Sequence, residues 1–183
     1  GAEDVLETAL AGADDGELFF EHIQSEGLSF DDGNLKSASA NTSQGFGLRA
    51  VFGDAVGLAH ASELSPEALR RAADSVSSAR AGYSGTVDAS PVNTNRAMYM
   101  GDNPLSGTPF DQKVDLLAEI DAYARAKDPR VKQVMVSLAG QWQAVSILKQ
   151  NGASFADIRP LVRLNVAVVV EQNGRMETGS FGS

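Results

Sequence analysis

The sequence predicts an α+β fold with two lobes, each built from a helix and a mainly antiparallel sheet. Two observations lead to this prediction. Strand-like stretches follow one another with only short turns between them, as in an antiparallel meander. In addition, a helix start of the Ser-Pro or Thr-Pro type occurs at Ser65–Pro66 and again at Thr108–Pro109. The two halves therefore look like similar layers, and the sequence leaves open whether they arose by duplication.

The longest strand-like stretch lies near the end of the sequence. Apolar residues occupy every second position there, at Val162, Leu164, Val166, Val168 and Val170. This period of two indicates a strand with one buried face. The Asn173–Gly174 pair that follows is a strong hairpin signal, because both residues tolerate positive φ. A return strand over residues 175–181 places Phe181 across from Val166 on the buried face.

The first predicted domain covers residues 1–83 and contains a helix, a four-strand meander and a second helix. The first helix spans residues 3–11 and the second begins at Ser65. The meander is expected to comprise residues 18–26, a short run 28–30 that leads through a turn at 32–33 into 35–40, then 45–52, and finally 55–60 after a turn at 53–54.

The second predicted domain covers residues 108–183 and contains a helix and an antiparallel sheet that ends in the long hairpin. The helix has an apolar stripe of Phe110, Val114, Leu117, Ile120 and Ala124. The strands before the hairpin are expected at 131–138, 141–148 and 153–158. Residues 84–107, rich in Gly, Ser, Asn, Asp and Pro, form the predicted connector, which is longer than usual loops and therefore a candidate functional segment.

Composition narrows the functional classes. The chain has 183 residues, 43% of them hydrophobic and 21% charged, as in an ordinary globular protein. Its net charge of −9 argues against a nucleic-acid partner, which requires clustered Lys and Arg. The absence of cysteine excludes disulfides and thiolate metal sites. We find no apolar run of about 20 residues and no signal-peptide pattern, so we expect a cytoplasmic protein without a membrane partner.

Few residues suggest chemistry by themselves. The segment Gly45–Ala50 fits the G-x-G-x-x-G/A pattern of dinucleotide sites, but it lies inside a predicted strand, where glycines indicate close approach of another segment. His22 and His60 lie in separate predicted strands, so a metal site is not expected. The pairs Asp14–Asp15 and Asp31–Asp32 stand beside glycines, as turn residues do. The sequence shows no catalytic constellation.

Asp157, Arg159 and Arg163 form the most interesting charged group, at the start of the long strand. One interpretation is charge compensation between neighbouring side chains. The other is that the arginines recognise a carboxylate or a neighbouring domain, because the guanidinium fork binds carboxylates with two hydrogen bonds.

Several motifs together resemble the TldD branch of the TldD/PmbA family. The segment Asp157–Leu164, which reads Asp-Ile-Arg-Pro-Leu-Val-Arg-Leu, carries the resemblance together with Lys113–Leu117 and the valine-rich strand. Further matches, in the order of the family, are Gly16–Phe20, Lys36–Ser37, Gly45–Ala50 and Gly53–Asp54. The resemblance implies a bacterial zinc metalloprotease system in which TldD pairs with a PmbA (TldE) subunit to cut unfolded or modified peptides. The family is also named as a modulator of DNA gyrase.

The chain departs from the family in one respect. The metal motif of the family, His-Glu-x-x-x-His, does not occur in these residues. The resemblance therefore implies the N-terminal and central domains of a zinc metallopeptidase. We expect this piece to bind no zinc and to cleave no peptide by itself.

The resemblance also suggests a role for the terminal hairpin. We expect its outer edge, including Arg175 and Gly179, to line the approach of a peptide substrate, with Arg159 and Arg163 bracing the junction to the catalytic domain. The alternative is that these edges pack against that domain or against the PmbA-like partner. A second functional class is an acidic adaptor without enzymatic activity that binds gyrase-related or antitoxin-related proteins.

Overall fold

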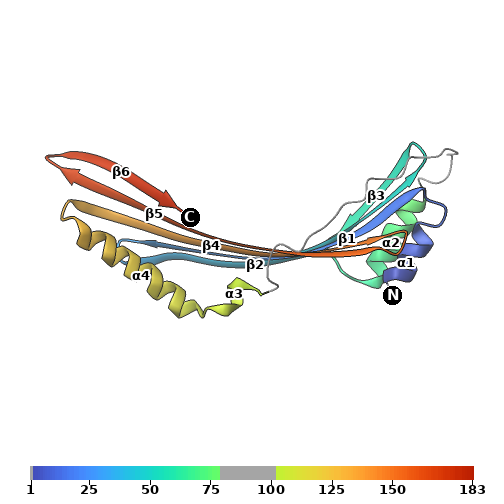
Figure 1. Ribbon diagram of the computed structural model, residues 1–183, viewed down its shortest axis with the longest axis horizontal. Helices are drawn as coiled ribbons and strands as arrows, with labels where there is room; N and C mark the ends of the chain where they lie inside the picture. Colours follow the sequence, from blue (N-terminus) through green and yellow to red (C-terminus); the bar gives the residue numbers. More distant parts are fainter. Residues whose placement is uncertain (1, 79–101) are drawn as a thin grey trace. The chain divides into compact units, whose positions relative to one another are not determined.

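In the computed structural model of the chain, residues 2–78 and 102–183 are described. They form one six-stranded sheet in the order β3-β2-β1-β4-β5-β6, together with four helices (Figure 1). The strands are β1 (Asp15–Asp31), β2 (Asn34–Phe52), β3 (Ala55–Ala61), β4 (Val131–Lys149), β5 (Ser154–Gln172) and β6 (Arg175–Gly182). The helices are α1 (Ala2–Ala9), α2 (Pro66–Ser77), α3 (Pro104–Gly107) and α4 (Phe110–Lys127). The predicted α+β class with an antiparallel sheet is confirmed.

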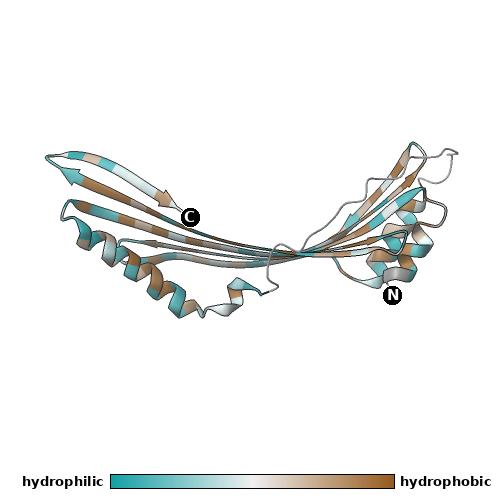
Figure 2. Ribbon diagram, viewed as in Figure 1, coloured by the Kyte–Doolittle hydropathy of each residue, from teal (hydrophilic) through white to brown (hydrophobic). Residues whose placement is uncertain are grey.

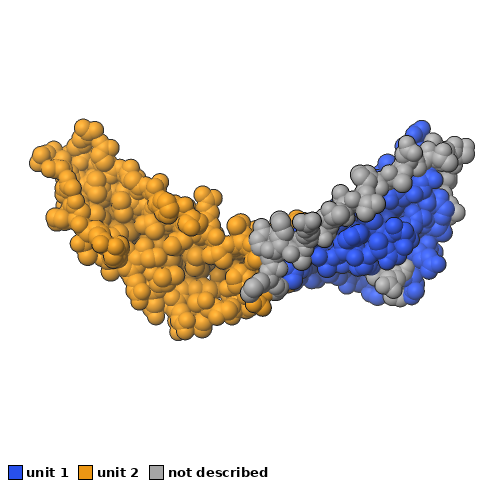
Figure 3. Space-filling view, viewed as in Figure 1, with its two compact units in different colours: residues 1–23, 43–100, 143–158 blue, residues 24–42, 101–142, 159–183 orange. Residues whose placement is uncertain are grey.

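The chain divides into two compact units, coloured separately in Figure 3. Unit 1 comprises residues 1–23, 43–100 and 143–158, and unit 2 comprises residues 24–42, 101–142 and 159–183. Strands β1, β2, β4 and β5 each contribute residues to both units because they are 17 to 19 residues long. The sequential boundaries at 1–83 and 108–183 stay a prediction, and most of the predicted connector, residues 84–101, lies outside the described residues.

The predicted four-strand meander before α2 is wrong, since the described residues form three long strands there. Strand β1 joins the runs 18–26 and 28–30, and β2 joins 35–40 and 45–52. Small and polar residues suggested breaks at these points, but pairing with neighbouring strands keeps the backbone extended despite weak intrinsic propensity. In the same way β4 joins 131–138 and 141–148 through Gly140. A Cβ atom at Gly140 would overlap the side chain of Leu105, so the glycine makes room for a neighbour within a continuous strand.

Two tight turns set the register of their hairpins. Asp32 and Gly33 have φ of 48° and 74°, and Asn173 and Gly174 have φ of 55° and 79°. Positive φ at both central residues is the type I′ geometry that closes two-residue hairpins. The β5–β6 hairpin has the predicted register, with Phe181 paired to Val166. Its predicted burial is wrong: Phe181 is 76% exposed, because β6 is the edge strand and Phe181 stays outside the core cluster.

The core of unit 1 lies between helices α1 and α2 and one face of β1, β2 and β3. Its buried residues are Leu6, Ala9, Leu10, Leu18, Phe46, Leu48, Ala50, Phe52, Ala68, Leu69, Ala72, Ala73 and Val76. As predicted, Ser65 caps α2: its Oγ accepts a hydrogen bond from the N–H of Ala68 at 3.1 Å, and Pro66 occupies the first turn. The alanines of α2 are small enough to allow a close approach to the sheet. Figure 2 colours the residues by hydropathy and shows hydrophobic residues (brown) alternating with hydrophilic ones (teal) along α4.

The core of unit 2 lies between α4 and the strands β1, β4 and β5. Leu117 is completely buried among Leu28, Phe30, Val134 and Val136, and Leu164, Val166 and Val168 pack against this cluster. The predicted cap at Thr108 is wrong. Pro109 occupies the N-cap position without a side-chain bond, because Thr108 already ends α3. Phe110, predicted in the apolar stripe, is 55% exposed at the first residue of the helix.

Candidate functional site

The best candidate for a binding surface is the outer edge of β6, the last strand in the sheet order. All its residues are exposed. Leu164 and Ser183 exchange two backbone hydrogen bonds, each 2.9 Å long. Because hydrogen-bonded and non-hydrogen-bonded pairs alternate in an antiparallel ladder, the odd-numbered residues of β6 bond to β5. The even-numbered residues Met176, Thr178 and Ser180 therefore direct their N–H and C=O groups away from the sheet.

Side chains of β6 alternate between the two faces of the hairpin. Phe181 and Gly179 pair with Val166 and Val168, which pack against the α4 cluster, so they lie on the helix-covered face. Met176, Thr178 and Ser180 lie on the other face. The edge therefore offers outward main-chain groups. The apolar side chain of Phe181 lies on one face of the strand, and the hydroxyl groups of Thr178 and Ser180 lie on the other.

A hollow lies at the tip of the hairpin. Its lining includes Arg130, Glu171, Gln172, Arg175 and Glu177. The guanidinium of Arg130 bonds Gln172 at 2.8 Å and also the carboxylate of Asp128 at 2.6 Å, and Arg175 Nε bonds Glu177 at 2.7 Å. Hydrogen bonds from Arg130 lower the pKa of Asp128 to about 2. Since both arginines already have partners, the hollow supports the shape of the hairpin tip and does not offer unused charge to a ligand.

The predicted site residues are spread along β5 and β6. Asp157, Arg159 and Arg163 lie on β5, with Asp157 half-buried and both arginines exposed. Arg163 stands just beyond the last pair of the hairpin, whereas Arg175 stands at its turn. Nine residues of strand separate the two ends, or about 30 Å. Gly179 lies in the middle of β6, with no atom within 4 Å of where its Cβ would be. A bracing role for Arg159 and Arg163 stays a prediction.

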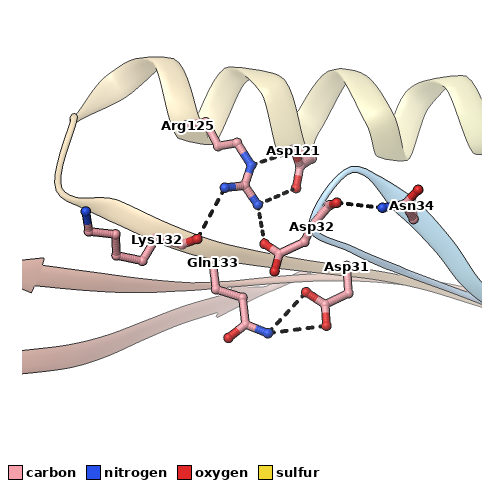
Figure 4. Close-up of polar contacts among 7 residues, drawn as sticks. All are labelled: Asp31, Asp32, Asn34, Asp121, Arg125, Lys132 and Gln133. Atoms are coloured by element: carbon pink, nitrogen blue, oxygen red, sulfur yellow. Dashed lines mark hydrogen bonds and ion pairs between the residues drawn. The ribbon is translucent and has the colours of Figure 1, made fainter.

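A polar cluster connects α4 to the β1–β2 turn (Figure 4). Arg125 binds Asp121 at 2.9 Å, binds Asp32, and donates to the carbonyl of Lys132 at 3.3 Å. The two aspartates raise the pKa of Arg125. The sequence predicted Asp32 as a turn residue, and its positive φ confirms this. Its partner on α4 was missed, because 93 residues separate the two side chains and no local pattern connects them.

A second polar contact fixes the other end of α4. Lys113 is buried, and its Nζ donates to both oxygens of Glu26 at 2.6 and 2.9 Å and to the carbonyl of Leu105 at 2.8 Å. This anchor was not predicted from the sequence. A usable signal existed, since Lys113 and Asp121 stand four residues before and after Leu117 and so share its helix face. Both polar contacts are structural and position α4 on the sheet.

The remaining sequence motifs find structural explanations. A Cβ atom at Gly45 would lie 2.8 Å from the carbonyl oxygen of Ala61, so the predicted close approach is confirmed there, whereas Gly47 has only a neighbour at 4.0 Å. His22 lies on β1 and His60 on β3, with β2 between them. Within residues 2–78 and 102–183, no group of three or more His, Asp or Glu side chains is placed to hold a metal ion.

Models of known protein families match most of the chain. The family model described as "PmbA/TldA metallopeptidase domain 1" matches residues 16–81, and "PmbA/TldA metallopeptidase central domain" matches residues 103–183. The chain belongs to the TldD/PmbA metallopeptidase family. The "Metalloprotease TldD homolog" of Haemophilus influenzae is 37% identical over 170 residues, and that of Buchnera aphidicola from Schizaphis graminum is 32% identical over 171 residues. The alignments cover 91% and 92% of the TldD-like chain but only 35% of each relative.

Solved structures show the same fold. TldE from Thermococcus kodakarensis matches with a TM-score of 0.76 at 15% identity, over 100% of the present chain and 42% of TldE. A Thermotoga maritima protein described as a candidate modulator of DNA gyrase matches with a TM-score of 0.76 at 16% identity, over 98% of the present chain and 42% of the other. The chain thus spans well under half the length of these relatives. None of its described helices is long and apolar enough to cross a bilayer.

Proposed function

We propose that this chain is the non-catalytic N-terminal and central part of a TldD-like metalloprotease that degrades unfolded or modified peptides. In this proposal the chain contributes substrate access, and zinc and the hydrolytic residues belong to the remainder of the full-length enzyme. The observation that supports it is the exposed edge of β6, where Met176, Thr178 and Ser180 direct main-chain groups outward. The assembled enzyme is expected to include a PmbA/TldE-like subunit.

An open strand edge suits a protease that accepts many sequences. Every residue except proline offers the same N–H and C=O groups, so a peptide that adds to the sheet is held without being read by its side chains. Unfolded peptides have free main-chain groups, whereas folded proteins have already paired most of theirs. The edge would therefore favour unfolded substrates.

The proposal is tested by a proline substitution at a residue of β6 whose backbone N–H points away from the sheet. In the full-length protein, Thr178→Pro removes a donor on the free edge and leaves the bonds between β5 and β6 in place. We expect peptide affinity and cleavage at low substrate concentration to fall about fivefold, because one hydrogen bond of about 1 kcal/mol is lost. Thr178→Val keeps the N–H and is the matched control.

Two results would overturn the proposal. One is unchanged peptide cleavage in the Thr178→Pro variant. The other is normal peptide binding combined with loss of assembly with the partner subunit, measured by size-exclusion chromatography. The second result would make the edge of β6 a subunit interface.

A further inference from the structure

We infer that the β6 edge has one side-chain subsite, formed by Gly179, Phe181 and Val168, that takes a large apolar residue of the incoming peptide. This inference rests on the proposed addition of a peptide strand to β6. It adds a specificity that main-chain pairing does not supply. With this subsite, the best substrates are segments that carry an aromatic or long aliphatic residue. Folded proteins normally bury such residues.

The ladder geometry places one peptide side chain opposite Gly179. Thr178 and Ser180 point their main-chain groups outward, so they would form the hydrogen bonds to an added strand. Gly179 lies between them and bonds inward to β5, so the peptide residue across from it occupies a non-hydrogen-bonded position. At such positions the two Cα atoms are only about 4.5 Å apart and the side chains are closest.

Gly179 leaves space at this position. No atom lies within 4 Å of where its Cβ would be, and its φ is not in the left-handed region. The backbone therefore does not require glycine, and the space over it is open. Its partner on β5 is Val168, which is half-buried against the α4 cluster. A long side chain from the peptide can lie across the glycine and contact Val168, as aromatic residues do when they cover a glycine in a neighbouring strand.

Phe181 forms the wall of this space. It stands two residues from Gly179 on the same face of the sheet, within the diagonal reach of a long side chain on the neighbouring strand. Phe181 is 76% exposed although it lies beside an apolar strand. On the other side of Gly179, the carboxylate of Glu177 pairs with the guanidinium of Arg175 at 2.5 Å. The apolar side chain of the peptide would therefore contact Val168 and Phe181. The subsite is therefore apolar on two sides and open to the added strand.

The experiment compares two short peptides rich in serine and threonine that differ only at the central residue, phenylalanine or serine. We expect the full chain to bind the phenylalanine peptide about three- to tenfold more tightly, because cross-strand aromatic contacts are worth about 0.5–1.5 kcal/mol. Phe181→Ala should reduce this ratio to about one. Gly179→Val, which fills the space, should do the same. Met176→Ala, on the opposite face of β6, is the control and should leave the ratio unchanged.

The outcomes separate this inference from the proposed function. If both peptides bind equally and neither Phe181→Ala nor Gly179→Val has an effect, the subsite does not exist while strand addition stands. If neither peptide binds, strand addition itself is wrong. If Phe181→Ala instead abolishes self-association of the chain in sedimentation experiments, the occupant is a second copy and the inference is overturned. Circular dichroism of each variant confirms that it is folded.

Discussion

Helices α2 and α4 each pack on strands of their own unit, but the residues that they bury differ in kind. The buried residues of α2 are Ala68, Leu69, Ala72, Ala73 and Val76, all apolar and mostly small. Those of α4 are Lys113, Leu117 and Asp121, so two of its three buried residues are charged. The difference shows two ways to hold a helix on a sheet.

Small side chains let α2 approach β3 closely. A Cβ atom at Gly57 would lie 2.9 Å from the carbonyl oxygen of Val76, so the strand has to carry a glycine there. Close packing of this kind is stabilised by apolar burial and dispersion, which have no preferred direction. On α4, the charged groups require particular partners, Glu26 for Lys113 and Arg125 for Asp121. Since a buried charge without a partner is costly, these contacts fix how the helix lies on its strands.

The largest expected effect concerns Lys113. Lys113→Met leaves the Glu26 carboxylate in a mostly buried place without its cation. We expect the free energy of unfolding to fall by about 3 kcal/mol, the low end for breaking a buried pair, because Glu26 keeps some contact with water. Urea denaturation measures the change. The double variant Lys113→Met/Glu26→Gln removes both charges and should recover at least half of the loss. No recovery would mean that packing of the lysine stem, and not the charge pair, is what matters.

The counterpart in unit 1 is Gly57→Ala. The added methyl group meets the backbone of Val76, which cannot rotate away, so we expect a loss of about 2 kcal/mol. Gly47→Ala is the matched control, because its nearest neighbour, the carbonyl oxygen of Ala59, would lie 4.0 Å from the new atom. The control should be neutral or slightly stabilising through reduced freedom of the unfolded chain. Equal effects of the two substitutions would contradict the close approach of α2.

The contrast between the helices also explains what the sequence allowed us to predict. Local signals were read correctly: the Ser65 cap, the Asn173–Gly174 turn and the pairing of Phe181 with Val166 depend on neighbouring residues. These features arise from backbone geometry, which the chain encodes over a few positions. The buried face of α2 is likewise a local pattern, because apolar residues at helical spacing are enough to define it.

Features that depend on distant partners were not predictable. The contact of Arg125 with Asp32 joins residues 93 positions apart, and Lys113 with Glu26 joins residues 87 apart. A charged residue on a helix is normally expected to be exposed, so apolar periodicity placed neither Lys113 nor Asp121 in the core. The exposure of Phe181 was likewise missed, because period two indicates which face a residue occupies but not whether its strand lies at the edge.

The two helix starts provide a third, smaller test. Ser65→Ala removes the acceptor for the Ala68 N–H, and we expect a loss of about 1 kcal/mol in the free energy of unfolding. Thr108→Ala should have almost no effect, because α4 begins without a side-chain cap. Both are measured by urea denaturation. A similar loss in the two variants would show that Thr108 caps α4 in solution, as the sequence first suggested.

The smallest expected effect concerns the exposed ion pair of Asp128 and Arg130 in unit 2. This pair shows how solvent weakens an ion pair, in contrast to the buried pair of Lys113 and Glu26. Hydrogen bonds from Arg130 hold the pKa of Asp128 at about 2, below its ordinary value of 3.8. A carboxyl group whose pKa is lowered by folding stabilises the folded state above its unfolded pKa. That contribution is therefore complete above about pH 4 and is lost as the pH falls through about 2. The Asp128 carboxyl resonance, followed by NMR, should titrate near pH 2.

Arg130→Met should move this midpoint part of the way towards 3.8, because the guanidinium donors to Asp128 are gone while the backbone N–H of residue 130, which also donates to Asp128 at 2.9 Å, remains. Arg175→Met, at the other arginine of the same hollow, should leave it unchanged, since Arg175 binds Glu177 instead. Stability near neutral pH should change little in either variant, because surface ion pairs contribute little. A midpoint that stays near pH 2 after Arg130→Met would mean that backbone donors hold the carboxylate. In that case the lowered pKa of Asp128 would not depend on the Arg130 side chain. The comparison with Lys113 would then rest on the buried pair alone.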